Sequence, residues 1–293
     1  MGYQERTSAG AESGPVEIEL LAIGNELLRG LVQDTSSYWL CRQLTGRGGQ
    51  VEQVLIIPDE IEIIAKSLQR ALRAKRALII TTGGLGPTHD DLTLQAVAQA
   101  SGCPLQLHPQ AEQMVVDCYR RLAQAGRVHA GELSASRRKM ALLPQGAVAL
   151  ANRVGAAPGV LLKQRASLIV SLPGVPPEMR DIFANSLQPY LATLFGDRAY
   201  LERELVSSVN DESEIAPLLQ AVQMRWPQVY LKSRAHSFAE GMRIQITLTI
   251  SGRAATVRQT LLQALDDLQR TLAQAGVSTR PLEEGPPRPP ETG

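Results

Sequence analysis

Hydrophobic residues change their spacing repeatedly along the first two thirds of the chain. The apolar runs 18–23 and 78–82 are continuous, which predicts strands buried on both faces. Residues 61–72 carry apolar side chains every three or four positions, which predicts an amphipathic helix. Strands that alternate with helices are typical of an α/β domain with a mostly parallel sheet and helices on both faces, and we expect one over residues 16–196.

The remaining elements of this domain follow from the same patterns and from turn residues. We expect strands at 51–57, 105–107, 148–150, 160–162 and 168–172, and helices at 34–44, 90–100, 109–125 and from 176 to about 195.

The pattern changes after residue 196. Residues 242–250 alternate strictly between apolar and polar, which indicates a strand with one face in water. The predicted order of elements, β-α-β-β-α, favours a small α+β domain with an antiparallel sheet over residues 197–276. The leader 1–15 is polar and the tail 277–293 is rich in proline, so we expect both to be disordered.

Composition narrows the class of protein. The chain has 293 residues, 44% of them hydrophobic, and a formal net charge of +1. Its overall charge therefore gives no electrostatic attraction to nucleic acid or to an anionic membrane. Its three cysteines are widely spaced and form no Cys-x-x-Cys motif. No signal peptide or membrane-spanning run is present. We therefore expect a cytoplasmic protein that binds neither nucleic acid nor membranes.

A glycine-rich loop follows the apolar run 78–82. Gly83, Gly84 and Gly86 let the backbone approach a ligand closely, and we expect a helix to begin directly after them, with Thr88 and Asp91 as a capping box. A strand, a glycine loop and a helix start present backbone N–H groups to a phosphate. The adjacent carboxylates of Asp90 and Asp91 would repel that phosphate without a cation, so the loop predicts a phosphorylated ligand and a divalent metal.

A second loop carries a glycine and a carboxylate after the strand 18–23. Its residues are Gly24, Asn25 and Glu26. Ligands of open α/β sheets bind at the carboxyl ends of strands, so both loops are expected to face one crevice. We predict Asp91, Asp90 and Glu26 as the catalytic and metal-binding residues, because carboxylates suit metal-assisted hydrolysis of a pyrophosphate.

Further candidates for ligand contacts lie later in the chain. They are Thr88, Lys139, Asn152, Gly159, Gly174 and Glu178. Each also has a purely structural interpretation. Lys139 can belong to a solvated basic face, Asn152 can satisfy a turn, and Glu178 can cap a helix.

Five segments carry a family resemblance: 24–30 (GNELLRG), 82–93 (TGGLGPTHDDLT), 141–144 (ALLP), 157–159 (APG) and 172–179 (LPGVPPEM). Together they resemble the competence/damage-inducible CinA family. The resemblance implies a three-layer, molybdopterin-binding-like α/β domain related to the MoaB and Mog proteins, followed by a small KH-like α+β domain. Full-length members add a nicotinamide mononucleotide deamidase domain, which we do not expect in this chain because a proline-rich tail takes its place.

The resemblance also implies an activity, namely hydrolysis of the pyrophosphate of ADP-ribose or a related nucleoside diphosphate with Mg²⁺, Mn²⁺ or Co²⁺. The alternative is a protein that binds molybdopterin or a nucleotide without turnover. The chain departs from the family pattern at Ser36, across 137–140, at Arg153 and at Ala156. We expect a homo-oligomer, with a dimer favoured.

Overall fold

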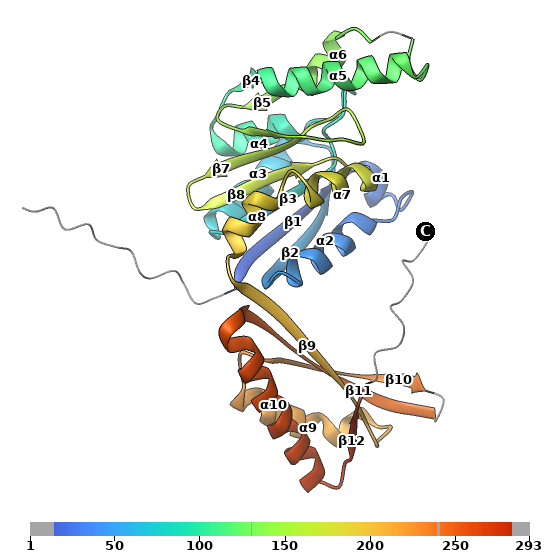
Figure 1. The fold of residues 1–293 in the computed structure, drawn as a ribbon, viewed down its shortest axis with the longest axis vertical. Coiled ribbons are helices and arrows are strands. Elements are labelled where there is room, and N and C mark those ends of the chain that lie inside the picture. Colours follow the sequence, from blue (N-terminus) through green and yellow to red (C-terminus); the bar gives the residue numbers. More distant parts are fainter. Residues whose placement is uncertain (1–14, 130, 239–240, 283–293) are drawn as a thin grey trace, which may run out of the picture. The chain divides into compact units, whose positions relative to one another are not determined.

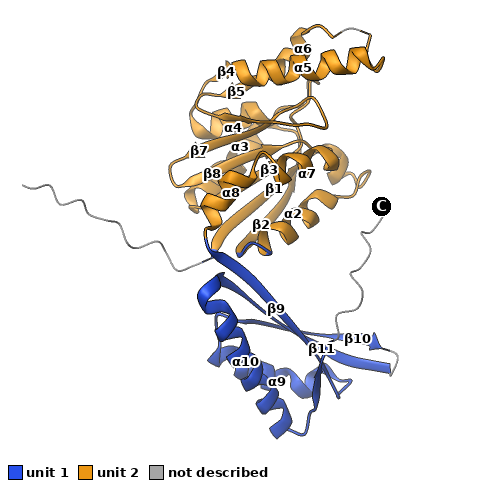
Figure 2. Cartoon of the chain, viewed as in Figure 1, with its two compact units in different colours: residues 1–15, 46–48, 197–293 blue, residues 16–45, 49–196 orange. Residues whose placement is uncertain are grey.

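The computed structural model describes residues 15–129, 131–238 and 241–282, which form two compact units. The larger, α/β unit comprises residues 16–45 and 49–196 (orange in Figure 2). The smaller, α+β unit contains residues 46–48 and the chain from Asp197 onward (blue in Figure 2). The change of pattern after residue 196 therefore coincides with a change of unit.

The α/β unit is built on a six-stranded sheet with the order β2-β1-β3-β8-β7-β6. Its strands are β1 (Val16–Ile23), β2 (Gly49–Ile57), β3 (Leu78–Thr82), β6 (Val148–Leu150), β7 (Gly159–Gln164) and β8 (Ser167–Leu172). The first four strands in the sheet order run parallel, whereas β7 pairs antiparallel with both β8 and the edge strand β6. The prediction of a mostly parallel sheet is confirmed.

Eight helices and a two-stranded sheet complete this unit among the described residues. The helices are α1 (Asn25–Leu28), α2 (Thr35–Thr45), α3 (Ile61–Arg73), α4 (Thr93–Ser101), α5 (Pro109–Gln124), α6 (Ala135–Lys139), α7 (Pro176–Ala184) and α8 (Gln188–Phe195). The small sheet pairs β4 (Leu105–Leu107) with β5 (Leu142–Pro144).

The α/β unit has three layers (Figure 1). Ile18 and Leu20 of β1 pack in one core cluster with α2, α7 and α8. Leu21 and Ile23 pack in a second cluster with α3, α4 and α5. Strand side chains point to opposite faces in turn, so an apolar run such as β1 fills the cores on both sides of the sheet.

Two predicted helices differ from the observed ones. The helix expected from Asp90 begins at Thr93, because the Thr93 hydroxyl donates to the carbonyl of Gly83 at 2.8 Å and the Thr93 N–H to that of Gly84 at 3.2 Å. The helix expected from 176 to about 195 is two helices, which are separated at Asn185–Leu187. Pro189 in the first turn of α8 is consistent with a new helix start.

The α+β unit carries an antiparallel sheet with the order β10-β11-β9-β12. Its elements are β9 (Arg198–Ser207), α9 (Glu212–Arg225), β10 (Tyr230–Phe238), β11 (Gly241–Arg253), α10 (Ala254–Gln274) and β12 (Thr279–Pro281). The apolar face of β11 packs in one cluster with α9 and α10. The predicted α+β class and the predicted order of its elements up to α10 are confirmed.

The prediction that the tail is disordered from residue 277 is wrong for its first residues. Thr279–Pro281 pair with β9 as an edge strand, and the Leu282 N–H donates to the carbonyl of Glu204 at 3.0 Å. Backbone pairing of this kind needs no sequence pattern, and Pro281 at an edge is compatible with it. The rest of the predicted tail and the predicted leader, apart from Pro15, lie outside the described residues. No helix in the described part of the chain is long and apolar enough to cross a membrane.

Candidate functional site

The two glycine–carboxylate loops meet at the carboxyl ends of the parallel strands. A cavity of about 590 Å³ opens there, and both Glu26 and the loop from Gly83 to Asp91 line it. Two backbone hydrogen bonds tie neighbouring strand ends together: Gly24 N–H to the carbonyl of Ile57 at 3.1 Å, and Gly83 N–H to that of Leu172 at 3.0 Å. The prediction that the loops face one crevice is therefore confirmed.

Glycine is required at the point where these loops touch. The backbone of Gly83 has φ +99°, a value that residues other than glycine rarely adopt. A methyl group at this position would also lie 2.2 Å from the carbonyl oxygen of Ile23. A methyl group at Gly174 would lie 3.3 Å from the Gly83 Cα atom. The loops after β1, β3 and β8 are thus packed backbone against backbone, which leaves the cavity above them.

The turn from Thr88 to Asp91 holds its two carboxylates in place without starting a helix. The Thr88 N–H donates to Asp91 Oδ2 at 2.8 Å, and the Thr88 hydroxyl contacts the carboxylates of both Asp90 and Asp91. The hydrogen bond from Thr88, together with a backbone bond and the nearby charges of His89 and Lys139, holds the pKa of Asp90 below its usual value. Only half of the expected capping box forms, and it lies within the loop: Asp91 accepts from the Thr88 N–H, but the Asp91 N–H donates to the Thr88 carbonyl at 3.3 Å and not to its hydroxyl.

Lys139 reaches the same turn from α6. Its ammonium group donates to the carbonyl of Thr88. It lines a smaller cavity of about 20 Å³ beside the main one, together with Gly84, Gly86 and Asp91. Lys139 therefore contacts the glycine loop through the carbonyl of Thr88, and this contact stabilises the loop.

The opposite wall of the cavity contains Glu178, in the first turn of α7. Asn152 donates from Nδ2 to Glu178 Oε2 at 2.7 Å and to the carbonyl of Ala157 at 2.8 Å. Burial raises the pKa of Glu178, and the hydrogen bond from Asn152 partly offsets that effect. Asn152 itself is not among the residues that line the cavity, so its observed contact is with Glu178.

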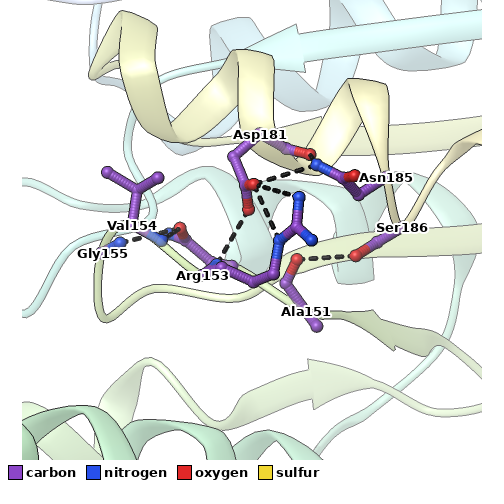
Figure 3. Close-up of polar contacts among 8 residues, drawn as sticks. Ala151, Arg153, Val154, Gly155, Asp181, Asn185 and Ser186 are labelled. Carbon is purple, nitrogen blue, oxygen red and sulfur yellow. Dashed lines mark hydrogen bonds and ion pairs between the residues drawn. The ribbon is translucent and has the colours of Figure 1, made fainter.

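The segment that carries Asn152 is fastened to α7 by a carboxylate (Figure 3). Asp181 accepts from the Arg153 N–H at 2.9 Å, from Arg153 Nε at 2.9 Å and from Arg153 Nη2 at 2.8 Å. Ser186 donates to the carbonyl of Ala151 at 2.7 Å. Burial raises the pKa of Asp181, but the hydrogen bonds from Arg153 outweigh it, so the pKa lies below its usual value. Arg153, which departs from the family pattern, is therefore the residue that anchors the wall.

The structure gathers most of the predicted site residues around the larger cavity. Those that line it are Glu26, Gly83, Gly84, Gly86, Thr88, Asp90, Asp91, Gly174 and Glu178. Gly159 does not: it is a buried residue of β7, where a methyl group would lie 2.9 Å from Ile182 Cγ2. Its small size therefore serves the packing of β7 against α7.

The sequence interpretation missed Asp59 and Tyr119, which also line the cavity. Asp59 Oδ2 accepts from the Asn25 N–H at 2.8 Å. Its position directly after β2 was the available signal, because the carboxyl ends of parallel strands share one edge. Tyr119 lies in α5, and nothing in its spacing separates it from a core residue.

The donor set at this cavity fits a metal that is shared with a ligand. Carboxylates of Glu26, Asp59, Asp90 and Asp91 line it. Within the described residues, no three His, Cys, Asp or Glu side chains converge closely enough to hold a metal ion. Mg²⁺ is commonly bound by one or two carboxylates plus substrate phosphates rather than by a complete protein cage, so these residues are suitable for it.

Fold and site together define a three-layer α/β domain with a ligand-sized, carboxylate-bearing cavity at the ends of its parallel strands. Residues 19–193 match the family described as "Probable molybdopterin binding domain", and the chain belongs to that family.

Relatives of known sequence extend over both units. A protein of Aeropyrum pernix is 40% identical over 262 residues, which is 88% of this chain and 94% of that protein. A protein of Pyrococcus furiosus is 36% identical over 202 residues, or 69% of this chain and 79% of the relative. Among solved structures, the protein CinA from Thermoplasma acidophilum, of unknown function, is 28% identical with a TM-score of 0.54 and covers 60% of this chain and 98% of its own.

Proposed function

We propose that the α/β unit binds a phosphorylated pterin or nucleotide together with a divalent metal ion, and that it hydrolyses the pyrophosphate of that ligand. The observation that carries the proposal is the shared cavity, in which two glycine loops and the carboxylates of Glu26, Asp59, Asp90 and Asp91 meet. Its volume of about 590 Å³ lies within the range of small-molecule sites. Membership of the molybdopterin-binding family supports a pterin or nucleotide as the ligand.

The glycine loops supply the phosphate contacts in this proposal. Gly83, Gly84 and Gly86 carry no side chains, so phosphate oxygens can approach the loop closely. The N–H groups of Gly84 and Gly86 would be the donors, because the Gly83 N–H already donates to the carbonyl of Leu172. Asp91, Asp90 and Glu26 would hold Mg²⁺, Mn²⁺ or Co²⁺, which would neutralise the phosphate oxygens and lower the pKa of a bound water.

The protonation state of Asp90 is compatible with the same assignment. A metal ligand must be ionised, as an ordinary aspartate is at neutral pH, and the lowered pKa keeps Asp90 ionised further into acid. Glu26 lines the cavity from the neighbouring strand end, where it can accept a proton from an attacking water.

Binding without turnover is the second candidate function. Asp91 makes two contacts with Thr88 inside the turn, and Lys139 of α6 contacts the carbonyl of Thr88. These groups therefore already stabilise the loop without a ligand. The departures at Ser36 and Ala156 and across 137–140 also favour this alternative.

Incubation of the purified chain with ADP-ribose and Mg²⁺, Mn²⁺ or Co²⁺ separates the two candidates. The hydrolase proposal expects AMP release by the wild type and a loss of at least 100-fold in Asp91→Ala, which is the order of effect of a catalytic metal or general-base group. If the wild type releases no more AMP than Asp91→Ala while still binding the ligand, the protein is a binding protein.

The α+β unit is proposed to mediate self-association. We propose a dimer, and the KH-like character of this unit likewise remains a prediction. Sedimentation of the full chain and of a variant that ends at residue 199 tests the role: the full chain should sediment as a dimer and the shortened one as a monomer.

A further inference from the structure

The lining of the cavity consists of more than glycines and carboxylates. It also has an apolar part, which includes Tyr119, Met140, Ala156, Ala157, Val175 and Pro176. The Sγ atom of Cys118, next to Tyr119 in α5, contacts the carbonyl of Gly155 at 3.4 Å. This contact brings the α5 side of the cavity to the segment beneath Glu178. An apolar compartment of this kind is suited to a flat heterocycle.

Glu178 packs on the loop that carries Asn152. A methyl group at Gly155 would lie 2.0 Å from the Glu178 carboxylate carbon, so the carboxylate rests directly on the backbone of Gly155. Asn152 Oδ1 accepts from the N–H groups of Val154 at 3.0 Å and Gly155 at 2.8 Å. These bonds fix the orientation of the Asn152 amide, whose Nδ2 must therefore donate to Glu178.

A fixed, partly buried carboxylate has hydrogen-bonding capacity that one amide does not exhaust. A carboxylate offers about four lone-pair positions, and Asn152 occupies one of them, at Oε2. Burial of the charged group is unfavourable until further donors meet it, as the raised pKa of Glu178 indicates. A ligand with two adjacent N–H donors would satisfy the group in a bidentate manner.

We propose that Glu178 is the specificity-determining residue of the site and that it accepts two hydrogen bonds from the 2-amino-4-oxopyrimidine edge of the ligand. Pterin and guanine both present that edge, with a ring N–H beside an exocyclic amino group. Adenine places a ring acceptor beside its amino group, so one carboxylate oxygen would face a lone pair. This inference rests on the proposed binding of a phosphorylated pterin or nucleotide. It names the edge of the heterocycle that the protein recognises.

Calorimetric titration of the full chain with GDP, IDP and ADP in the presence of Mg²⁺ tests the inference. A bidentate pair discriminates by about 10- to 100-fold, so GDP should bind that much more tightly than ADP. IDP keeps the ring N–H but lacks the amino group, and it should fall between the two. Neopterin monophosphate is the pterin arm: if it binds more tightly than GDP, pterin is the preferred source of the shared edge.

Glu178→Gln should abolish the preference for GDP while changing ADP affinity by less than about threefold, because its amide removes one of two acceptors. Glu60→Gln, an exposed carboxylate that is not among the cavity-lining residues, is the matched control and should keep the preference. The wild-type series GDP, IDP, ADP decides by itself if the Glu178 variant does not fold.

Two contrary outcomes are distinct. Equal binding of GDP and ADP by the wild type, or an unchanged preference in Glu178→Gln, overturns the role of Glu178 and leaves the proposed function standing. If neither the nucleotides nor neopterin monophosphate binds, the proposed function fails with it.

Discussion

The anchor between Arg153 and Asp181 gives a quantitative prediction for the variant Asp181→Asn. The Asp181 side chain is 11% exposed, and its Oδ1 atom also accepts from Asn185 Nδ2 at 3.0 Å. An amide has only one oxygen, so in either orientation its NH₂ group must face a donor of Arg153: the backbone N–H or the guanidinium. One side of the anchor is therefore lost and a donor is left unpaired.

The size of the effect follows from the exposure of the partner. The Arg153 side chain is 61% exposed, so the Coulombic part of the pair is worth about 0.2–1 kcal/mol. A hydrogen bond contributes about 0.5–1.5 kcal/mol, and water can replace the carboxylate at these exposed Arg153 donors. We expect Asp181→Asn to lower the free energy of unfolding by about 1 kcal/mol, or the midpoint of the α/β unit by about 2–4 °C.

Urea unfolding followed by circular dichroism measures the loss, with Asp117→Asn as the control. Asp117 is 53% exposed and pairs with Arg120 at 3.7 Å, so its substitution should stay within about 0.5 kcal/mol of the wild type. The stabilisation by Asp181 also depends on pH. The pKa of Asp181 is lowered, so its stabilisation exists above the ordinary pKa of about 3.9 and is lost as the pH falls through the lowered value. Equal effects of both variants at pH 7, or a gap that widens in acid, would refute it.

Three other substitutions test the loops and the wall. Gly83→Ala should destabilise by at least about 2 kcal/mol in urea unfolding, because the new methyl group meets a carbonyl of β1; Gly30→Ala, with φ +68° but open space around it, should cost about 1 kcal/mol. Thr88→Ala should raise the pKa of Asp90 toward its ordinary value in a carboxyl NMR titration; no change would contradict the assigned hydrogen bond. Burial raises the pKa of Glu178, so ionisation of this group destabilises the folded wild type. The stability of Glu178→Gln relative to the wild type should therefore increase as the pH rises from 4 to 7, and a relative decrease would contradict the burial argument.

Local patterns were sufficient to predict the layers and the main part of the site. Continuous apolar runs such as β1 placed buried strands, and the rule that parallel strands end at one edge joined Glu26 to Asp91 across the fold. The same rule also applies to Asp59, which follows β2 and which the sequence interpretation left out.

The wall of the cavity depends on contacts that no local pattern records. Arg153 and Asp181 lie 28 positions apart, and their pairing depends on how α7 packs against the sheet. Thr279–Pro281 became a strand through backbone pairing with β9, whatever their side chains. Gly159 is a different case, because the structure places this motif glycine in the packing of β7 against Ile182 of α7 and not in the lining of the cavity.

Crystals grown with Mn²⁺ and a non-hydrolysable methylene analogue of GDP would test the central claim most directly. The proposal expects an anomalous manganese peak coordinated by carboxylates from both loops, Glu26 and Asp91, with the phosphonate groups on the backbone of Gly83 to Gly86. Manganese bound elsewhere, or an analogue whose phosphonates lie away from the two glycine loops, would contradict the account.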